Sequence, residues 1–326
     1  MKLGAGAAVA ANIGAAVEAT SAKAPDTDSG QEWKLKRDHV WVWDGPANTL
    51  GPSIYGLGET TKYLHSDNVV CMWLSSKTKR PAAFKKLKDF KRVVWDLTRT
   101  TWRGKHVTPV GEEAQAVGFF MEDSWSEGRG EESKEEALKV SKFSKTYGNI
   151  DGGILDYSFG GFASRGGTPA DLKEIQSALK ADNPSLKLYW MQYTQDVDPK
   201  WSDYLPYVDV ISLWEPKRDN LKNLDASLDR CAEVFPGKPI LLGLYLADYW
   251  AQRLGAGEKH ERQWHRDWAV EPIPVDLLEL QFSKAVQYVK EGRIIGFSIL
   301  AGALVDMFPE TAEWIRNFLE KELAGK

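Results

Sequence analysis

The sequence has 326 residues, of which 43% are hydrophobic and 27% are charged, and its formal net charge is −4 at pH 7. These values are ordinary for a globular protein, and they exclude collagen-like, disulfide-scaffold and wholly disordered classes. The negative charge argues against general nucleic-acid binding. The sequence contains no stretch of about 18 or more uncharged apolar residues, so a membrane-spanning helix is not predicted.

Residues 1–30 differ in composition from the rest, because Ala, Gly, Ser and Thr dominate them. One interpretation is an export signal with Ala22-Lys23-Ala24 as a small-residue cleavage site. The other is a disordered leader, since the apolar run is interrupted by Asn12 and Glu18. The first interpretation predicts a secreted or periplasmic protein, and neither enters the argument for the fold.

From about residue 69 onward, short apolar runs alternate with amphipathic helical patterns, which is typical of parallel βα units. Eight runs are predicted strands: Val69–Leu74, Arg92–Leu97, Val117–Asp123, Gly153–Phe159, Lys187–Tyr193, Asp209–Glu215, Pro239–Tyr249 and Ile294–Gly302. Helix signals lie between them, among them Thr168 and Pro169 at a predicted helix start and Gly292 at a predicted helix end.

Eight strands and their helices in about 250 residues match a (β/α)8 TIM barrel of the α/β class. An open doubly wound sheet is the alternative, although no glycine-rich turn follows Leu74 as that fold usually requires. We therefore predict a barrel over residues 69–326, with residues 31–68 as an N-terminal extension.

In such a barrel, the residues that reach a substrate lie at the C-terminal ends of the strands. Carboxylates, amides and aromatic rings occupy these ends, namely Asp96, Glu122, Asp123, Asp156, Gln192, Tyr193, Trp214, Glu215, Tyr245 and Asp248. Alternation along a strand predicts that Asp156, Trp190, Gln192, Trp214 and Tyr245 face the barrel axis. Glu215 has outward parity, but Pro216 follows it and lets the side chain turn over the rim.

Two carboxylates on different strands suit glycosidic bond cleavage, which needs one acid for the leaving oxygen and one nucleophile or base. We predict Asp156 as nucleophile or base and Glu215 as general acid, with Glu122 and Asp248 in reserve. The predicted substrate-binding residues are Asp96, Glu122, Trp190, Gln192, Tyr193, Trp214, Tyr245 and Asp248.

Each of these residues also has a structural interpretation: a carboxylate that fixes a loop, a rim ion pair or a ring that fills the core.

The run Gly153-Ile154-Leu155-Asp156-Tyr157 resembles the fourth-strand nucleophile segment of retaining α-glycosidases. More widely, residues 69–324 resemble the TIM-barrel glycoside hydrolase superfamily. The acid/base carboxylate of the α-glycosidases follows the sixth strand, where Glu215 stands here. The resemblance implies a glycosidase, and the later run from Gly237 to Tyr245 is similar to segments of uncharacterised bacterial barrel proteins.

The expected partner is an oligo- or polysaccharide. The basic stretch Lys77–Arg92 favours an anionic glycan, or is the solvated face of a helix. With only five histidines, no HExxH motif and no paired CxxC motif, the chain gives a zinc enzyme weak support, and we expect no metal or cofactor. A polysaccharide lyase, a sugar isomerase, a non-catalytic glycan-binding barrel and a metal-dependent hydrolase remain alternative functions.

Overall fold

The computed structural model describes residues 33–45, 47–48, 51–52, 55–72, 80–98, 131–248, 271–302 and 304–325. All of them belong to one compact unit, Glu32–Lys326. The predicted leader, residues 1–30, lies outside the described residues.

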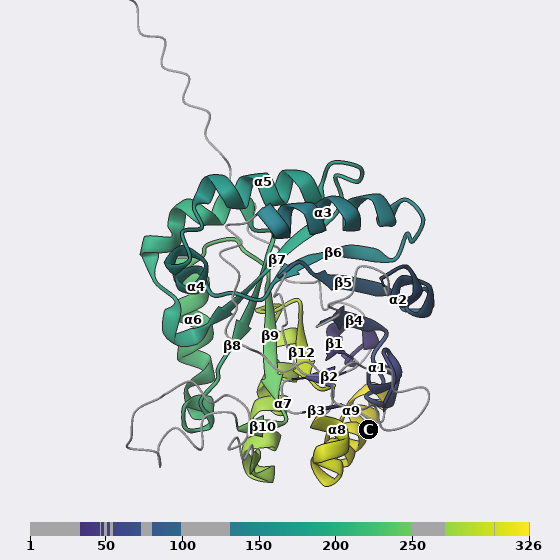
Figure 1. Ribbon diagram of the computed structural model, residues 1–326. Helices are drawn as coiled ribbons and strands as arrows, with labels where there is room; N and C mark the ends of the chain where they lie inside the picture. Colours follow the sequence, from purple (N-terminus) through teal and green to yellow (C-terminus); the bar gives the residue numbers. More distant parts are fainter. Residues whose placement is uncertain are drawn as a thin grey trace, which may run out of the picture. The chain divides into compact units, whose positions relative to one another are not determined.

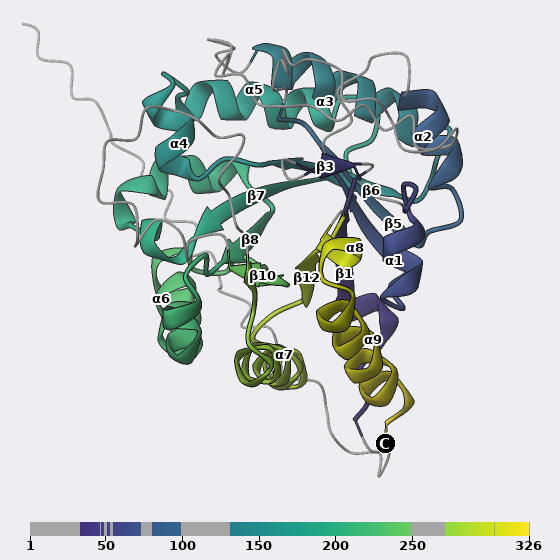
Figure 2. The same cartoon turned by 60° about the horizontal axis from the view of Figure 1, so that its bottom comes forward.

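Eight parallel strands close into a barrel in the order β1-β12-β9-β8-β7-β6-β5-β4 (Figures 1 and 2). The strands are β1 Val40–Asp44, β4 Asn68–Cys71, β5 Arg92–Asp96, β6 Ile150–Leu155, β7 Lys187–Tyr193, β8 Val210–Trp214, β9 Ile240–Tyr245 and β12 Gly296–Leu300. Every neighbouring pair in the ring is parallel, including β1 with β12, which closes it. The predicted TIM barrel is therefore confirmed.

The first strand of the ring differs from the sequence prediction. Val40–Asp44 forms β1 between β4 and β12, so the segment interpreted as an N-terminal extension supplies a barrel strand. The predicted strand Val117–Asp123 lies outside the described residues, and the ring closes among the strands that are described. All five residues of β1 are buried because neighbouring strands flank it and the barrel interior and outer layer cover its two faces.

Helices surround the strands, as Figure 2 shows in a view toward one end of the ring. They are α1 Glu59–Tyr63, α2 Arg80–Lys86, α3 Glu131–Ser144, α4 Phe159–Ser164, α5 Pro169–Leu179, α6 Leu224–Val234, α7 Val275–Lys290, α8 Leu304–Met307 and α9 Pro309–Ala324. The predicted helix start is confirmed, since Thr168 and Asp171 form a capping box ahead of Pro169. The predicted end is confirmed too, since Gly292 follows α7 with a φ of 71°.

Shorter elements join these parts. The two-stranded sheets pair β2 Ala47–Asn48 with β3 Gly51–Pro52, and β10 Ala247–Asp248 with β11 Glu271–Pro272. The 3-10 helices are η1 Arg37–His39, η2 Thr194–Asp196, η3 Pro199–Tyr207 and η4 Arg218–Asn223. The second sheet and η4 lie beyond the C-terminal ends of β9 and β8, so both contribute to the rim of the barrel.

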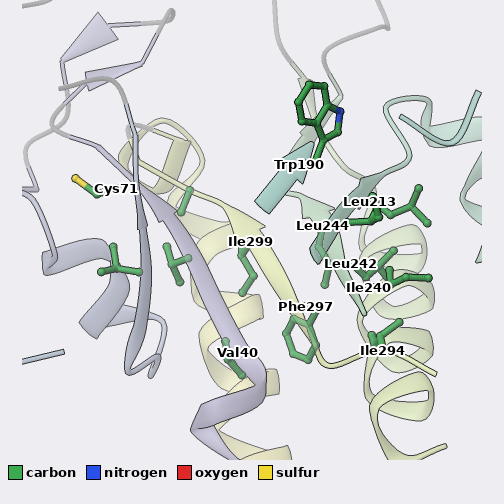
Figure 3. Packing of buried hydrophobic residues seen from close by; sticks show 14 of the residues in the cluster. Val40, Cys71, Trp190, Leu213, Ile240, Leu242, Leu244, Ile294, Phe297 and Ile299 are labelled. Carbon is green, nitrogen blue, oxygen red and sulfur yellow. The ribbon is translucent and has the colours of Figure 1, made fainter. Parts of the chain in front are cut away.

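A large hydrophobic core fills the space between strands and helices. Figure 3 shows part of it, with Trp190, Leu213 and Leu244 in the same cluster as Phe297 and Ile299. Both cysteines of the chain, Cys71 and Cys231, are buried in this core. Burial on this scale stabilises the barrel by roughly 25 cal/mol for each Å² of apolar surface removed from water.

The N-terminal end of the barrel is held by polar contacts. Asp151 at the start of β6 accepts hydrogen bonds from the Tyr189 hydroxyl and from Lys187 Nζ, at 3.3 Å in the second case. The Arg92 guanidinium lies 4.4 Å from the Trp41 ring centroid and its Nε donates to Asn68 Oδ1 at 2.9 Å. This end is a packed, hydrogen-bonded base, which in TIM barrels serves stability.

Candidate active site

A second hydrophobic cluster defines which residues face the barrel interior. It is made of Trp41, Trp43, Val70, Met72, Val94, Ile154, Tyr189, Met191, Val210, Trp214 and Leu241, with Tyr193, Tyr245 and Leu300 partly buried against it. Its members come from the eight ring strands and from Met72 just after β4, at alternate positions, and contain no helical residue. Because successive side chains of a strand point to opposite faces, the members mark the inward row.

Two acidic residues continue this inward row at the C-terminal rim. Asp96 ends β5 and is in register with Ile154, an interior residue of β6, so both side chains face the same side of the sheet. Asp156 follows Ile154 by two positions. The chains still run together there, because Leu97 N–H donates to Ile154 O at 2.8 Å. The predicted inward orientation of Asp156 therefore agrees with the parity of β6.

Asp156 is half-buried, and its carboxyl lies in a poorly solvated environment. Within the described part of the chain it forms no hydrogen bond or ion pair, although its backbone N–H donates to Thr98 Oγ1 at 2.5 Å. Burial raises the pKa of Asp156 from 3.8 to about 6. A carboxyl with such a pKa exchanges its proton near neutral pH, which suits general acid–base chemistry.

Thr98 and Tyr157 connect the two acids. Thr98 N–H donates to Asp96 Oδ1 at 2.8 Å, so one threonine contacts both aspartates through its backbone and side chain. Burial raises the pKa of Tyr157 above its usual value, and the carboxylates of Asp96 and Asp156 both raise it further. The Arg165 guanidinium, 4.8 Å from the Tyr157 ring centroid, opposes this shift. The phenol is therefore within electrostatic reach of both acids.

Glu215 has a different environment. It is 4% exposed, and it follows Trp214, whose side chain faces the interior. Its Oε2 accepts a hydrogen bond from Thr194 Oγ1 at 2.5 Å, and its Oε1 accepts from Lys217 N at 3.0 Å and Asn220 Nδ2 at 3.3 Å. Glu215 thus joins the end of β7 to η4, and its role as general acid stays a prediction.

Aromatic rings close the top of the barrel interior. The Trp43 and Trp214 rings meet edge to face at 4.7 Å, and Trp214 and Tyr245 meet at 5.0 Å. Trp214 is 2% exposed and its Nε1 donates to Ser212 Oγ at 2.9 Å. Its indole occupies the space above Gly243, where an added Cβ would lie 1.9 Å from Trp214 Cδ2. Trp214 faces inward as predicted, but it forms the floor of the mouth.

Two predicted substrate-binding residues face the wrong way for that role. Trp190 belongs to the outer core, where it stacks on Phe159 at 4.6 Å and meets Phe162 edge to face at 5.4 Å. Gln192 has the same parity, is fully buried, and accepts the Phe159 N–H at 3.1 Å. Our expectation that both face the axis is wrong, because both rows of β7 are apolar and alternation alone does not distinguish them.

The remaining predicted residues differ in access. Tyr193 and Tyr245 are partly buried at the ends of β7 and β9 on the inward row, so their rings border the mouth. Asp248 is buried in β10 and forms an ion pair with Arg218 Nε at 3.1 Å, which links β10 to η4. Glu122 lies outside the described residues.

The sequence prediction missed β1 and therefore two residues at its end. Trp43 lies on the inward row, with its Nε1 buried and unpartnered in the described structure. Asp44 points outward, and its Oδ2 accepts from Gly58 N, Thr61 N and Thr61 Oγ1 at 3.1, 3.0 and 2.7 Å. Burial raises the pKa of Asp44 to about 6. The sequence signal that could have revealed β1 is the run Val-Trp-Val-Trp-Asp, an apolar strand that ends in a carboxylate.

The described residues contain no group of three or more His, Cys, Asp or Glu side chains able to hold a metal ion. No helix in the same ranges combines the length and apolar character that crossing a membrane requires.

Solved structures similar to this chain are TIM-barrel glycoside hydrolases. A putative α-L-fucosidase from Bacteroides thetaiotaomicron aligns with a TM-score of 0.54 and 11% identity over 92% of this chain and 99% of that chain. A chitinase from Chromobacterium violaceum aligns with a TM-score of 0.46 and 15% identity, over 84% and 98% of the two chains. No family model matches the sequence, and no curated protein matches it. At these identities the likeness shows the fold.

Proposed function

We propose that the C-terminal mouth of this barrel binds an oligo- or polysaccharide and that the protein hydrolyses a glycosidic bond there, with Asp156 essential to the chemistry. The observation that carries the proposal is the half-buried, poorly solvated carboxyl of Asp156. It follows the fourth strand of the ring, has parity with the inward row, and has a pKa raised to about 6 by burial.

Three further features support the proposal. Active sites of TIM-barrel enzymes lie at the C-terminal ends of the strands, where Asp156 stands. The partly buried rings of Tyr193 and Tyr245 border the same mouth and can lie against the CH face of a sugar. The barrel fold is also that of the similar fucosidase structure, although fold alone does not assign an activity.

The test is Asp156→Asn measured against a panel of polysaccharides and aryl glycosides, with product analysis. We expect the wild-type protein to release a reducing sugar and the variant to lose at least about 10³-fold in kcat, which is within the usual contribution of general acid–base catalysis. Asp151→Asn is the matched control, because it changes an aspartate at the opposite end of the same strand, and it should keep turnover.

Other results would assign the mouth differently. A product with an unsaturated ring would indicate a lyase. Saccharide binding by the wild-type protein without any product would indicate a glycan-binding barrel. Full activity of Asp156→Asn on the true substrate would remove this residue from the mechanism.

A further inference from the structure

The hydrogen bonds of Glu215 make it a poor candidate for the second carboxylate of the proposed reaction. A general acid must place a protonated oxygen against the leaving group, and a general base must leave an oxygen lone pair for water. Both oxygens of Glu215 already accept hydrogen bonds, from Thr194 on one side and from Lys217 and Asn220 on the other. Glu215 is also almost fully buried on the outward parity of β8. Its environment is that of a residue that fixes the rim.

Asp96 has the position that Glu215 lacks. It is partly exposed, lies on the inward row, and stands on β5, the neighbour of β6 in the ring. Its register partner is Ile154, so Asp156 lies one strand across and two residues along. With strands about 4.8 Å apart and a rise of about 3.3 Å per residue, the two Cα atoms are about 8 Å apart.

Thr98 holds this arrangement. Its N–H donates to Asp96 Oδ1 and its Oγ1 accepts the N–H of Asp156, at 2.8 and 2.5 Å. Burial raises the pKa of Asp156, and Asp96 is not among the causes of that shift. Inverting glycosidases keep their two carboxyl groups about 6.5–9.5 Å apart, which leaves room for a water molecule between the sugar and the base. Acids on neighbouring strands, two residues out of register, suit such an arrangement.

We propose that Asp96 is the second catalytic carboxylate, acting with Asp156, and that Thr98 is a positioning residue for both. This inference rests on the proposed function. Asp156 gives its proton to the glycosidic oxygen as the bond from that oxygen to the anomeric carbon breaks. Asp96 takes a proton from the water whose oxygen bonds to the anomeric carbon. One water is consumed for each bond cleaved, and proton exchange with solvent restores both carboxyls. The role of Asp156 is then proton donor, in place of the nucleophile or base predicted from the sequence.

The test compares Asp96→Asn with Glu215→Gln, two substitutions that each replace a carboxylate with its amide. Asp96→Asn should lower kcat about 10³-fold or more with little change in KM. Glu215→Gln should lower kcat less than about tenfold and lower Tm, because the amide offers one accepting oxygen, in place of two, to the three donors. A Glu215→Gln variant that folds and has no turnover, beside an active Asp96→Asn variant, would overturn the pairing.

Thr98 needs a readout that loss of stability alone would not move. Thr98→Val removes the oxygen that accepts the Asp156 N–H, and should lower kcat about tenfold and shift the pH profile of kcat. Thr98→Ser keeps that oxygen and should restore both. An unchanged pH profile in Thr98→Val would contradict the positioning role.

Carboxyl labelling of the native wild-type protein tests the geometry without requiring activity. A water-soluble carbodiimide with glycinamide should modify Asp96 and Asp156 and leave Glu215 unmodified, and a bound oligosaccharide should protect both aspartates. Labelling and protection of Glu215 in place of Asp96 would overturn the inference. If the labelling pattern holds and the wild-type protein cleaves no glycoside, the proposed function fails, whereas the assignment of the two acids to one mouth stands.

Discussion

Strand β6 carries an aspartate at each end, and the two have opposite environments. Asp151, at the N-terminal end, accepts hydrogen bonds from Tyr189 and Lys187. Asp156, just beyond the C-terminal end, has no hydrogen-bond partner for its carboxyl in the described structure, and burial raises its pKa to about 6. An acid whose hydrogen bonds are satisfied stabilises the fold, whereas a poorly solvated acid without such partners costs stability.

The largest stability effect is expected at the base of the barrel. Asp151→Ala leaves the buried Tyr189 hydroxyl without its acceptor and removes the partner of Lys187, so it should lower the free energy of unfolding by about 3 kcal/mol. Urea denaturation measures this loss. Asp151→Asn keeps an acceptor for Tyr189 and should lose less. If Asp151→Ala cost nothing, the contrast between the two ends of β6 would be wrong.

At the mouth, replacement of Asp156 is expected to raise the free energy of unfolding, by an amount that depends on pH. A carboxyl with its folded pKa raised from 3.8 to about 6 stabilises the fold most below pH 3.8, and this stabilisation is lost as pH rises through about 6. Asp156→Asn should therefore be more stable than wild type by about 2 kcal/mol at pH 8 and by about nothing near pH 4.

Denaturation curves of both proteins at the two pH values check this prediction. Asp44, whose pKa burial also raises to about 6, is present in both proteins, so its titration cancels in the difference. A variant less stable than wild type at pH 8 would show that Asp156 has a stabilising partner.

The smallest stability effect is expected at a third acid, Asp44, which is fully buried. Asp44 accepts the N–H of Thr61 at the third position of α1 and so caps that helix from outside. Asp44→Ala should lower the free energy of unfolding by about 1 kcal/mol, as for loss of an N-cap residue, and Asp44→Asn should restore most of it. Thermal unfolding of the pair measures both changes, and a loss equal to that of Asp151→Ala would contradict the ranking.

Much of the barrel could be predicted from the sequence, because apolar runs, helix caps and short connections are local signals. Lys187–Tyr193 was predicted with the observed bounds, and Pro169 and Gly292 marked a helix start and end. The strand Val40–Asp44 has a local apolar pattern, but its place in the ring depends on pairing with β12, more than 250 residues away, which no local pattern shows.

The site was predicted less completely, for reasons of the same kind. Parity placed Trp214 and Tyr245 correctly, since their strands keep a regular alternation with interior residues, and Asp156 continues the alternation of β6 two residues beyond Ile154. It failed at Trp190 because β7 is apolar on both faces. The hydrogen bond from Thr194 to Glu215 joins residues 21 positions apart, and this contact exists only in the folded chain.

The indole of Trp214 seated on Gly243 has a consequence for how such a barrel can change. The two positions are coupled, since any side chain at 243 displaces the ring and any smaller residue at 214 opens a hollow beneath the mouth of the barrel. A deeper cavity with a side chain at position 243 therefore requires both residues to change. A smaller residue must replace Trp214 before Gly243 can be replaced.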